Sequence, residues 1–432
     1  MLSRQRITHV LTGLLLVAII LLSSTGASYR RPARSVVNLV MWQQWGGGHE
    51  KATLDKYIAL FNRTHPTIHV TEIPVTDNTK IVAAISGGHP PDLMDLGDTH
   101  TIGEWAHSGL LQPLDNYIKS SGMDMKAFVP AGWNAVTFQG KHWGVPFMNF
   151  NIALVYNRTE FQQAGITRPP RTLEELDQDA AKLTIVKNGR IVRMGYIPDS
   201  SGGNGLEYYA WLFGGDWFKG NKSTAADPAN VQALTWETTY YKKYGASNVT
   251  RFMSGFGQYL TAADGFESGK MAMIFDGWWT AFFAKENGVK FSIGAAPFPP
   301  PAAHPERANT SYLDTNPQVI PTGSPHPQEA FEFIKWETTN PQLCSEYAAL
   351  IANLPHLKTA PPNPLFKDPN FQVFLALSNS PNAHTTPKTP ISSQFATNLS
   401  NAEQSALLGK ATPQQALTAL QQTTQQELDS AH

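Results

Sequence analysis

Hydrophobic positions in the amino-terminal part of the chain follow the spacing of strands and helices in alternation. The apolar run at 35–40 is typical of a strand, and so are the runs at 68–73 and 92–96. Between the first two lies a helix, whose buried face is indicated by the i, i+3, i+4, i+7 spacing of Leu54, Tyr57, Ile58 and Phe61. Strand, helix, strand, helix, strand is the order of a parallel sheet with crossover helices.

The rest of the chain continues this alternation. Residues 141–157 are apolar and aromatic and predict extended chain, and residues 271–275 predict another strand. Two later helices begin with the spacing of a capping box, in which a threonine is followed three residues on by a side-chain acceptor: Thr172 with Glu175, and Thr412 with Gln415. We therefore expect an α/β protein.

Chain length predicts two domains or one very large one, and two breaks in the pattern favour two. The chain has 432 residues, whereas a typical domain has roughly 100 to 150. Residues 146–151 and 293–301 have the character of crossings between domains, and the second contains the proline-rich stretch 297–301.

The amino-terminal end has the three parts of a secretory signal. Arg4 and Arg6 form a basic flank, residues 10–22 form an apolar run, and residues 23–28 are small and polar. The apolar run is shorter than the roughly 20 residues that a membrane-spanning helix needs. We expect a signal peptide over 1–27, with an uncleaved signal anchor as the alternative. No Leu-x-x-Cys site follows, so we expect an exported protein without a cysteine-linked lipid, located in the periplasm or at the cell surface.

Composition excludes several classes of protein. Lysine and arginine total 33 and aspartate and glutamate total 34, so the formal net charge is −1. This balance argues against a nucleic-acid partner, which normally needs a basic surface. Cys344 is the single cysteine, so no disulfide forms within the chain.

Sequence motifs of common enzymes are absent. The chain has no phosphate-binding G-x-x-x-x-G-K-[ST] loop, no G-x-G-x-x-G, no H-E-x-x-H and no G-x-S-x-G. The 13 histidines show no spacing typical of metal ligands. We therefore expect no metal, no cofactor and no catalytic residues.

Aromatic residues beside amides and carboxylates are the most informative pattern. In α/β sheets, ligands bind beyond the carboxyl ends of strands. Aromatic faces pack on the C–H faces of sugars, while amides and carboxylates hydrogen-bond hydroxyls. The candidate ligand-binding residues follow predicted strands, loops or crossings and are Gln44, Trp45, Asp98, Asn149, Asn151, Tyr208, Trp211, Asp276 and Trp279.

A structural role explains several of these aromatic residues equally well. Trp42 and Trp278 have the position of core or rim residues at strand ends. Tyr208 and Tyr209 are adjacent and point in different directions, so at most one of them faces a ligand. For Asp98 and Asp276, each beside a glycine at a strand end, a ligand contact is the better interpretation.

An ordered series of motifs resembles the extracellular solute-binding proteins of sugar ABC importers, the family 1 proteins similar to maltose-binding protein. The resemblance covers nearly the whole chain after the signal. Its most specific parts are a tyrosine-asparagine pair before an alanine-glycine helix, and a segment with the pattern S-G-K-x-A-M followed by G-x-W, found here in LVYNRTEFQQAGI (154–166) and FESGKMAMIFDGWW (266–279).

The resemblance implies a two-lobe fold of type II, with a ligand cleft between lobes that close about hinge crossings. It implies lobe I over 36–148 and 295–345, and lobe II over 149–294 and 346–432. It also implies a carbohydrate ligand, a monomeric state, and delivery to the transmembrane subunits of an ABC permease whose ATPase is a separate subunit. Gln44, Trp45, Asp98, Tyr208 and Trp279 match positions that line the sugar cleft in relatives.

Two departures and two rival functions accompany the resemblance. The first crossing lacks the carboxylate of maltodextrin-binding members, and the region around His384 lacks their tryptophan, so maltose is not the expected ligand. A secreted glycoside hydrolase is one rival and needs two carboxylates roughly 5 to 10 Å apart. A binding protein for another solute, such as glycerol phosphate, is the second rival and needs an anion site.

Overall fold

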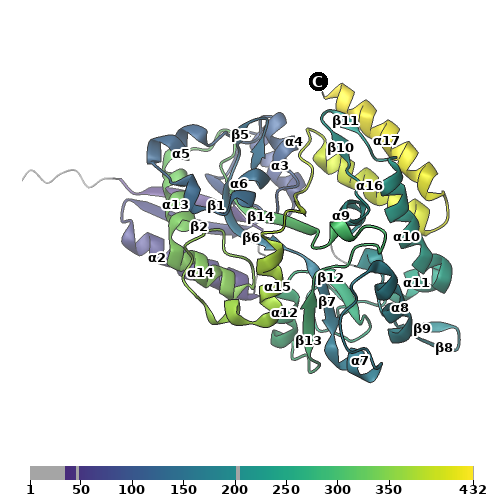
Figure 1. The fold of residues 1–432 in the computed structure, drawn as a ribbon. Coiled ribbons are helices and arrows are strands. Elements are labelled where there is room, and N and C mark those ends of the chain that lie inside the picture. The colour runs from purple at the N-terminus through teal and green to yellow at the C-terminus, as the bar shows by residue number, and fades with distance from the viewer. Residues whose placement is uncertain (1–34, 45–47, 201–204, 432) are drawn as a thin grey trace, which may run out of the picture.

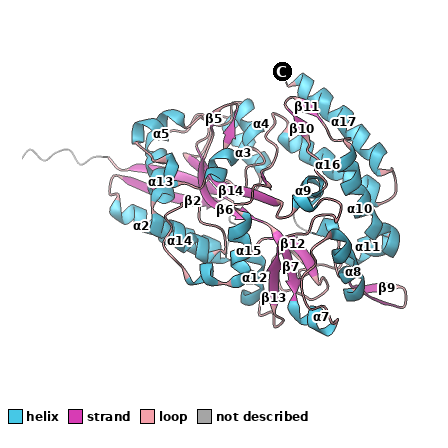
Figure 2. Cartoon of the chain, viewed as in Figure 1, coloured by secondary structure: helices cyan, strands magenta, loops and turns pink. Residues whose placement is uncertain are grey.

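The computed structural model describes residues 35–44, 48–200 and 205–431, and in it the chain folds into two lobes that lie side by side (Figure 1). The expected signal peptide, 1–27, lies outside these residues. Among the helices that are described, none is both long and apolar enough to cross a membrane. In each lobe, helices surround a set of central strands (Figure 2).

The first lobe is built on a six-stranded sheet with the order β15-β14-β3-β1-β2, in which β6 also pairs with β14. β1 runs parallel to β2 and β3, whereas β14 runs antiparallel to β3 and β6. The parallel sheet predicted for the amino-terminal part is therefore confirmed. The strands are β1 (Val37–Gln43), β2 (Ile68–Pro74), β3 (Leu93–Asp95), β6 (Val145–Asn151), β14 (Ser311–Val319) and β15 (Ala383–His384).

Helix α2 (Gly48–Thr64) joins β1 to β2, and α3 (Asn78–Ser86) joins β2 to β3. The predicted apolar face of α2 is buried, with Phe61 fully inaccessible to solvent. Asp77 begins α3, since its carboxylate accepts from the N–H groups of Thr79 and Lys80. The other helices of this lobe are α4 (Ile102–His107), α5 (Asp115–Ser121), α6 (Pro130–Ala135), α13 (Pro327–Thr339) and α14 (Pro341–Leu350). Short hairpin strands β4 (Thr137–Phe138) and β5 (Lys141–His142) complete it.

The second lobe contains a three-stranded antiparallel sheet with the order β12-β7-β13. Its strands are β7 (Ala153–Asn157), β12 (Met273–Asp276) and β13 (Ile293–Ala296). Two hairpins extend from this lobe, β8 (Ile185–Lys187) with β9 (Arg190–Arg193), and β10 (Phe218–Lys219) with β11 (Lys222–Ser223). The strands predicted within 141–157 and near 271–275 are confirmed.

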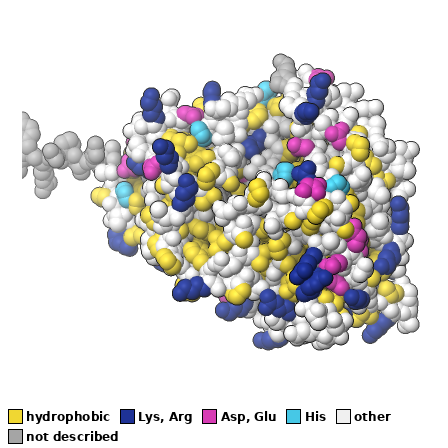
Figure 3. Space-filling model, viewed as in Figure 1, with side chains coloured by type: hydrophobic (Ala, Val, Ile, Leu, Met, Phe, Trp, Pro, Cys, Tyr) yellow, Lys and Arg dark blue, Asp and Glu magenta, His cyan; other side chains and the backbone are white. Residues whose placement is uncertain are grey.

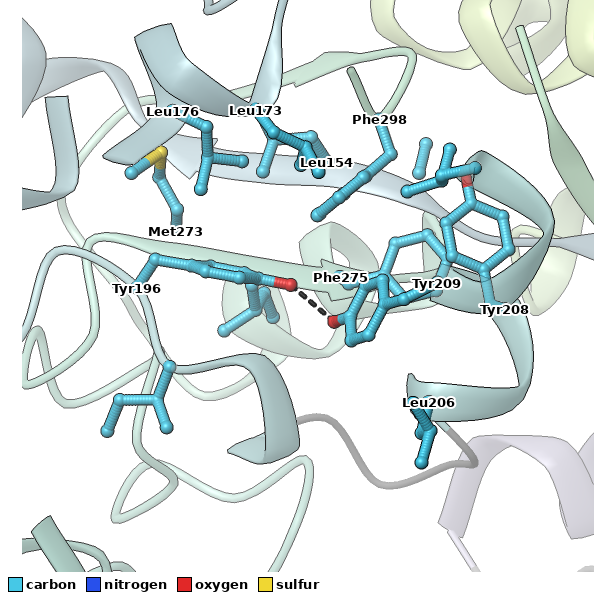
Figure 4. Packing of buried hydrophobic residues seen from close by; sticks show 14 of the residues in the cluster. Leu154, Leu173, Leu176, Tyr196, Leu206, Tyr208, Tyr209, Met273, Phe275 and Phe298 are labelled. Atoms are coloured by element: carbon cyan, nitrogen blue, oxygen red, sulfur yellow. Dashed lines mark hydrogen bonds between the residues drawn. The ribbon is translucent and has the colours of Figure 1, made fainter. Parts of the chain in front are cut away.

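Helices of the second lobe pack on this sheet and on each other around an aromatic core (Figure 4). Tyr196, Tyr209, Phe275 and Phe298 meet there, and the hydroxyls of the two tyrosines are hydrogen-bonded. The helices are α7 (Arg158–Gln163), α8 (Leu173–Leu183), α9 (Gly205–Leu212), α10 (Pro228–Tyr244), α11 (Ala246–Met253), α12 (Trp279–Glu286), α15 (Pro369–Leu377), α16 (Ser392–Leu407) and α17 (Pro413–Ser430).

One predicted capping box forms and the other does not. At α17, Thr412 and Gln415 each bond the backbone of the other, as predicted. At α8, Thr172 accepts from the N–H of Glu175, but the Glu175 carboxylate binds Arg168 and the N–H of Arg171 instead of the cap. The prediction of a complete box at α8 was therefore wrong, because a guanidinium competes for the same carboxylate.

The chain changes from one sheet to the other at identifiable points. β6 pairs in the first sheet and β7 in the second, so the first crossing is at Ile152. β13 still belongs to the second sheet, and the first sheet resumes at β14, so the next crossing occupies residues 297–310. In space-filling view, positive and negative side chains are interspersed across both lobes (Figure 3), in keeping with the net charge of −1.

Candidate functional site

A cavity of about 460 Å³ lies where the two lobes meet. The first lobe contributes the loop after β3, the second contributes α9, the end of β12 and the start of α12, and the crossing contributes residues near Phe150. The lining residues are Asn78, Gly97, Asp98, His100, Thr101, Phe150, Ile152, Gly205, Tyr208, Tyr259, Phe275, Asp276, Trp279, Tyr312, Ser393 and Ala396.

An ion pair forms one wall of the cavity. Asp98 Oδ1 accepts from the backbone N–H of His100 at 2.9 Å and lies 3.2 Å from His100 Nδ1. Burial opposes a charged imidazole, but the carboxylate of Asp98 raises the pKa of His100 to about 10. For Asp98, burial favours the neutral acid, yet the interaction with His100 lowers the pKa of the carboxyl below its usual value. At neutral pH this wall therefore carries one carboxylate and one imidazolium.

A second carboxylate, Asp276, stands at the end of β12 on the opposite lobe. Tyr259 donates its hydroxyl to the two carboxylate oxygens at 2.8 and 2.9 Å, and the N–H of Gly277 donates to Oδ1 at 2.8 Å. The indole N–H of Trp279 donates in turn to the Tyr259 hydroxyl at 2.7 Å. Burial raises the pKa of Asp276 to about 6, against the effect of these donors.

Trp279 and Phe150 supply aromatic surface to the cavity. Their ring centroids are 5.8 Å apart and their planes are nearly perpendicular, an edge-to-face arrangement that fixes both rings. Aromatic rings beside hydrogen-bonding carboxylates can hold a molecule with both C–H and O–H surface.

The adjacent tyrosines of α9 point in different directions, as the sequence predicts. Tyr208 lines the cavity, its ring lies 4.1 Å from that of Phe275, and its hydroxyl donates to the Thr310 carbonyl at 2.9 Å. Tyr209 instead turns into the core, where it bonds Tyr196 (Figure 4).

A polar network borders the cavity and connects the loop after β3 with β14. Tyr312 donates to Asp314 Oδ2 at 3.0 Å and lies 3.0 Å from the hydroxyl of Thr386. Thr386 Oγ1 is also 3.2 Å from His100 Nε2. The network ties the cavity wall to β14, the strand that enters the first sheet after the second crossing.

The cavity brings together four of the residues predicted from the sequence: Asp98, Tyr208, Asp276 and Trp279. Gln44 stands directly behind it, since its amide oxygen accepts from Gly97 N–H at 3.1 Å and its amide nitrogen donates to Asn78 Oδ1 at 3.3 Å. Trp45 lies outside the described residues. That these six residues contact the ligand stays a prediction.

Three other predicted residues are placed away from the cavity lining. Asn149 exchanges backbone hydrogen bonds with Leu354, and Asn151 donates to the Phe374 carbonyl at 2.7 Å. Trp211 is buried and stacks against the His384 ring with centroids 4.6 Å apart. Because side chains alternate along β6, Phe150 faces the cavity while its two asparagine neighbours face the other way.

Several lining residues were not predicted from the sequence. His100 follows Asp98 by two residues, so a histidine beside a candidate carboxylate was a usable signal. Tyr259 and Tyr312 gave no such signal, because Tyr259 lies in irregular chain and Tyr312 in a buried strand far along the sequence. Within the described residues, no group of three or more His, Cys, Asp or Glu side chains is arranged to hold a metal ion.

Comparisons with known proteins give a consistent picture. A family model described as bacterial extracellular solute-binding protein matches residues 46–342. A maltotriose-binding protein of Pyrococcus abyssi is 25% identical over 311 residues, which are 71% of this chain and 63% of that protein. The chain thus spans less than two thirds of the length of that relative.

Solved structures share the fold. The structure of CpMnBP1 with mannotriose bound is 33% identical, has a TM-score of 0.83, and is matched over 90% of this chain and 100% of that one. An ABC substrate-binding protein from Listeria monocytogenes in complex with cycloalternan is 21% identical with a TM-score of 0.78, matched over 91% and 100%. At that identity, the second likeness concerns the fold alone.

Proposed function

Because the chain belongs to the bacterial extracellular solute-binding protein family, we propose that it is the substrate-binding component of an ABC importer and takes a neutral carbohydrate in the cavity between its lobes. The observation that carries the proposal is the composition of that cavity. Aromatic rings of Phe150, Tyr208 and Trp279 share it with the carboxylates of Asp98 and Asp276. Similarity to a mannotriose-bound protein supports the choice of an oligosaccharide panel.

Ligand binding would act through closure of the lobes. A ligand that contacts both lobes favours the closed form by its differential affinity for that form. The closed form would dock on two transmembrane permease subunits, and a separate subunit would hydrolyse ATP. The protein would act as a monomer and carry out no catalysis.

The family is extracellular, which makes this an exported protein. We place the end of a cleaved signal peptide at Ala27, and an uncleaved anchor is the alternative outcome of sequencing the amino terminus of the exported protein. We place the lobe boundaries at Ile152, within 297–310, and after Ala360, from where the chain belongs mainly to the second lobe while β15 (Ala383–His384) returns to the first sheet. The second boundary overlaps the crossing expected at 293–301 and extends beyond it.

A phosphorylated solute fits the cavity less well than a neutral sugar. Among the described lining residues, none is a lysine or an arginine, and the imidazolium of His100 is already paired with Asp98. An added anion would also face Asp276. A glycerol phosphate ligand is therefore not favoured.

The test is isothermal titration calorimetry of the purified exported protein against mono- and oligosaccharides, with glycerol phosphate as the anionic comparison. We expect saturable binding of one sugar class, with the sugar recovered intact by chromatography. Recovery of shortened products would instead support a glycoside hydrolase. Saturation by glycerol phosphate alone would contradict the assignment to carbohydrates.

A further inference from the structure

We propose that the binding site continues past Trp279 into a second chamber, and that this chamber holds an additional uncharged sugar unit of an oligosaccharide. The inference rests on the proposed carbohydrate function and deepens it. It assigns a ligand-contacting role to Asn353, which lies far from the other cavity residues in sequence.

The second chamber adjoins the main cavity. It measures about 190 Å³ and is lined by Gly97, Phe150, Leu260, Trp279, Asn316, Ile351 and Asn353. The first cavity has Gly97, Phe150 and Trp279 in its own lining. The edge-to-face pair of Phe150 and Trp279 and the backbone at Gly97 therefore border both spaces.

The chamber has the size of a small polar unit. Its volume equals that of about six waters in the liquid, whereas the main cavity has the volume of about fifteen. A single pyranose ring with its hydroxyl groups fills a space of that order. A ligand that occupies both spaces must therefore be longer than the one that fills the main cavity.

The walls of the chamber favour a neutral unit. Among the described residues that line it, Asn316 and Asn353 supply side-chain amides and none is ionisable, in contrast to the main cavity with Asp98, His100 and Asp276. Amides donate to and accept from hydroxyl groups, but they do not neutralise a phosphate, an ammonium group or a carboxylate. The unit that enters should carry hydroxyl groups and no charge.

The two amides are held in place by hydrogen bonds. Asn316 donates to the Gly97 carbonyl at 2.6 Å, and Asn353 donates to Asn316 Oδ1 at 3.4 Å. Asn316 is thereby oriented from below, while Asn353 is half-buried and bonds Asn316 through a single amide N–H. An amide oxygen can accept a hydrogen bond from one sugar hydroxyl, and a second amide N–H can donate to another.

Two of the six described non-glycine residues with positive φ lie at this chamber. Leu260 and Ala352 have φ values of 58° and 55°, in the left-handed region that residues with a Cβ avoid. Leu260 is itself in the wall, and Ala352 lies between Ile351 and Asn353. Asn287 holds the strained turn, since its amide donates to the Leu260 carbonyl at 3.1 Å. Strain of this kind is kept where surrounding structure fixes it, commonly at ligand sites.

The experiment measures affinity along two ladders of probes, mannose to mannotetraose and glucose to maltotetraose, by calorimetry with the exported protein. Asn353→Ala is compared with wild type and with Asn134→Ala, an exposed asparagine of α6 that serves as a matched control. We expect one pair of consecutive chain lengths at which Asn353→Ala loses roughly fivefold to tenfold more affinity for the longer sugar than for the shorter one. Asn134→Ala should leave the affinity for both sugars at the wild-type value.

The outcomes separate this inference from the proposed function. If wild type binds an oligosaccharide and Asn353→Ala shifts every length by the same factor, the second chamber is overturned while the carbohydrate function stands. If no neutral sugar binds to wild type, the carbohydrate function fails and the chamber fails with it. Thermal unfolding of Asn353→Ala at the wild-type temperature establishes that the variant is folded.

Discussion

The indole ring of Trp279 lies directly over the α-carbon of Gly277. A Cβ atom placed on Gly277 would stand 2.0 Å from Cζ3 of that ring and 2.2 Å from two other ring atoms, far inside the contact distance of two carbons. The glycine therefore determines where the aromatic wall of the cavity stands. A side chain at position 277 would clash with the Trp279 ring, which explains the glycine in the Gly-Trp-Trp sequence.

Gly277→Ala should consequently displace the ring and weaken sugar binding. We expect a loss of about tenfold in affinity, which corresponds to about 1.4 kcal/mol, measured by calorimetry. Trp279→Ala provides the second arm of a double-mutant cycle. In the Trp279→Ala background, Gly277→Ala should have almost no further effect; an additive loss would show that it acts through something other than the ring.

Burial of the Asp276 carboxyl group should make the folded protein less stable at neutral and alkaline pH than at acidic pH. Burial raises the pKa of Asp276 to about 6 from an ordinary value of 3.8, so the folded state binds its proton more tightly than the unfolded state. The resulting stability is full below about pH 4 and is lost as the pH rises through 6. A shift of this size corresponds to about 3 kcal/mol.

Asp276→Asn removes that charge and keeps an oxygen that can accept from Tyr259 and Gly277. We expect the variant to have a free energy of unfolding about 2 to 3 kcal/mol higher than wild type at pH 8, with no difference below pH 4, measured by urea denaturation. Its sugar affinity should fall at pH 8, because a carboxylate acceptor is stronger than an amide. A difference in the free energy of unfolding between variant and wild type that is the same at pH 8 and below pH 4 would contradict the shifted pKa.

How much of this site the sequence predicted depended on whether the signal was local. The buried face of α2 was predicted from apolar residues spaced three and four apart. Asp98 and Asp276 were predicted from their positions beside glycines at the ends of strands. In β6, by contrast, alternation of apolar and polar residues could not predict which side chains face the cavity, because most residues of the strand are buried. Phe150 could therefore not be separated from Asn149 and Asn151. Tyr259 and Asn353 reach the site only through tertiary folding of irregular chain.

A pair of buried glutamates in the second lobe should give a second pH dependence. Glu237 and Glu403 lie close together away from solvent. Burial, and the nearby carboxylate of Asp199, raise the pKa of Glu403 to about 8, and burial also raises the pKa of Glu237. The folded state thus holds protons that the unfolded state releases near pH 4.5, and stability should decline from there to about pH 8.

Glu403→Gln should flatten this decline. We expect the variant to lose less stability than wild type between pH 5 and pH 8.5, with denaturant midpoints as the measurement. Glu306→Gln is the control, because Glu306 is exposed in the second crossing, 297–310, and its pKa is lowered rather than raised. A wild-type slope in Glu403→Gln would mean that the buried pair does not hold the extra proton.

Closure of the lobes should depend on a contact between α4 and α16. The Glu104 carboxylate accepts from the backbone N–H of Ser393, in the first turn of α16, at 2.8 Å, and a negative charge is favourable at a helix amino terminus. Next to it, Gly103 has no room for a side chain, since a Cβ would stand 2.6 Å from the Thr389 carbonyl oxygen. α4 belongs to the core of the first lobe and α16 to that of the second.

Glu104→Ala should therefore weaken sugar affinity by roughly twofold to fivefold, whereas Glu104→Gln, which keeps an acceptor, should lose less. Gly103→Ala should hold the lobes apart, so that small-angle scattering of the sugar-saturated variant gives a larger radius of gyration than wild type. Equal radii and equal affinities in all three variants would show that α4 and α16 do not control closure.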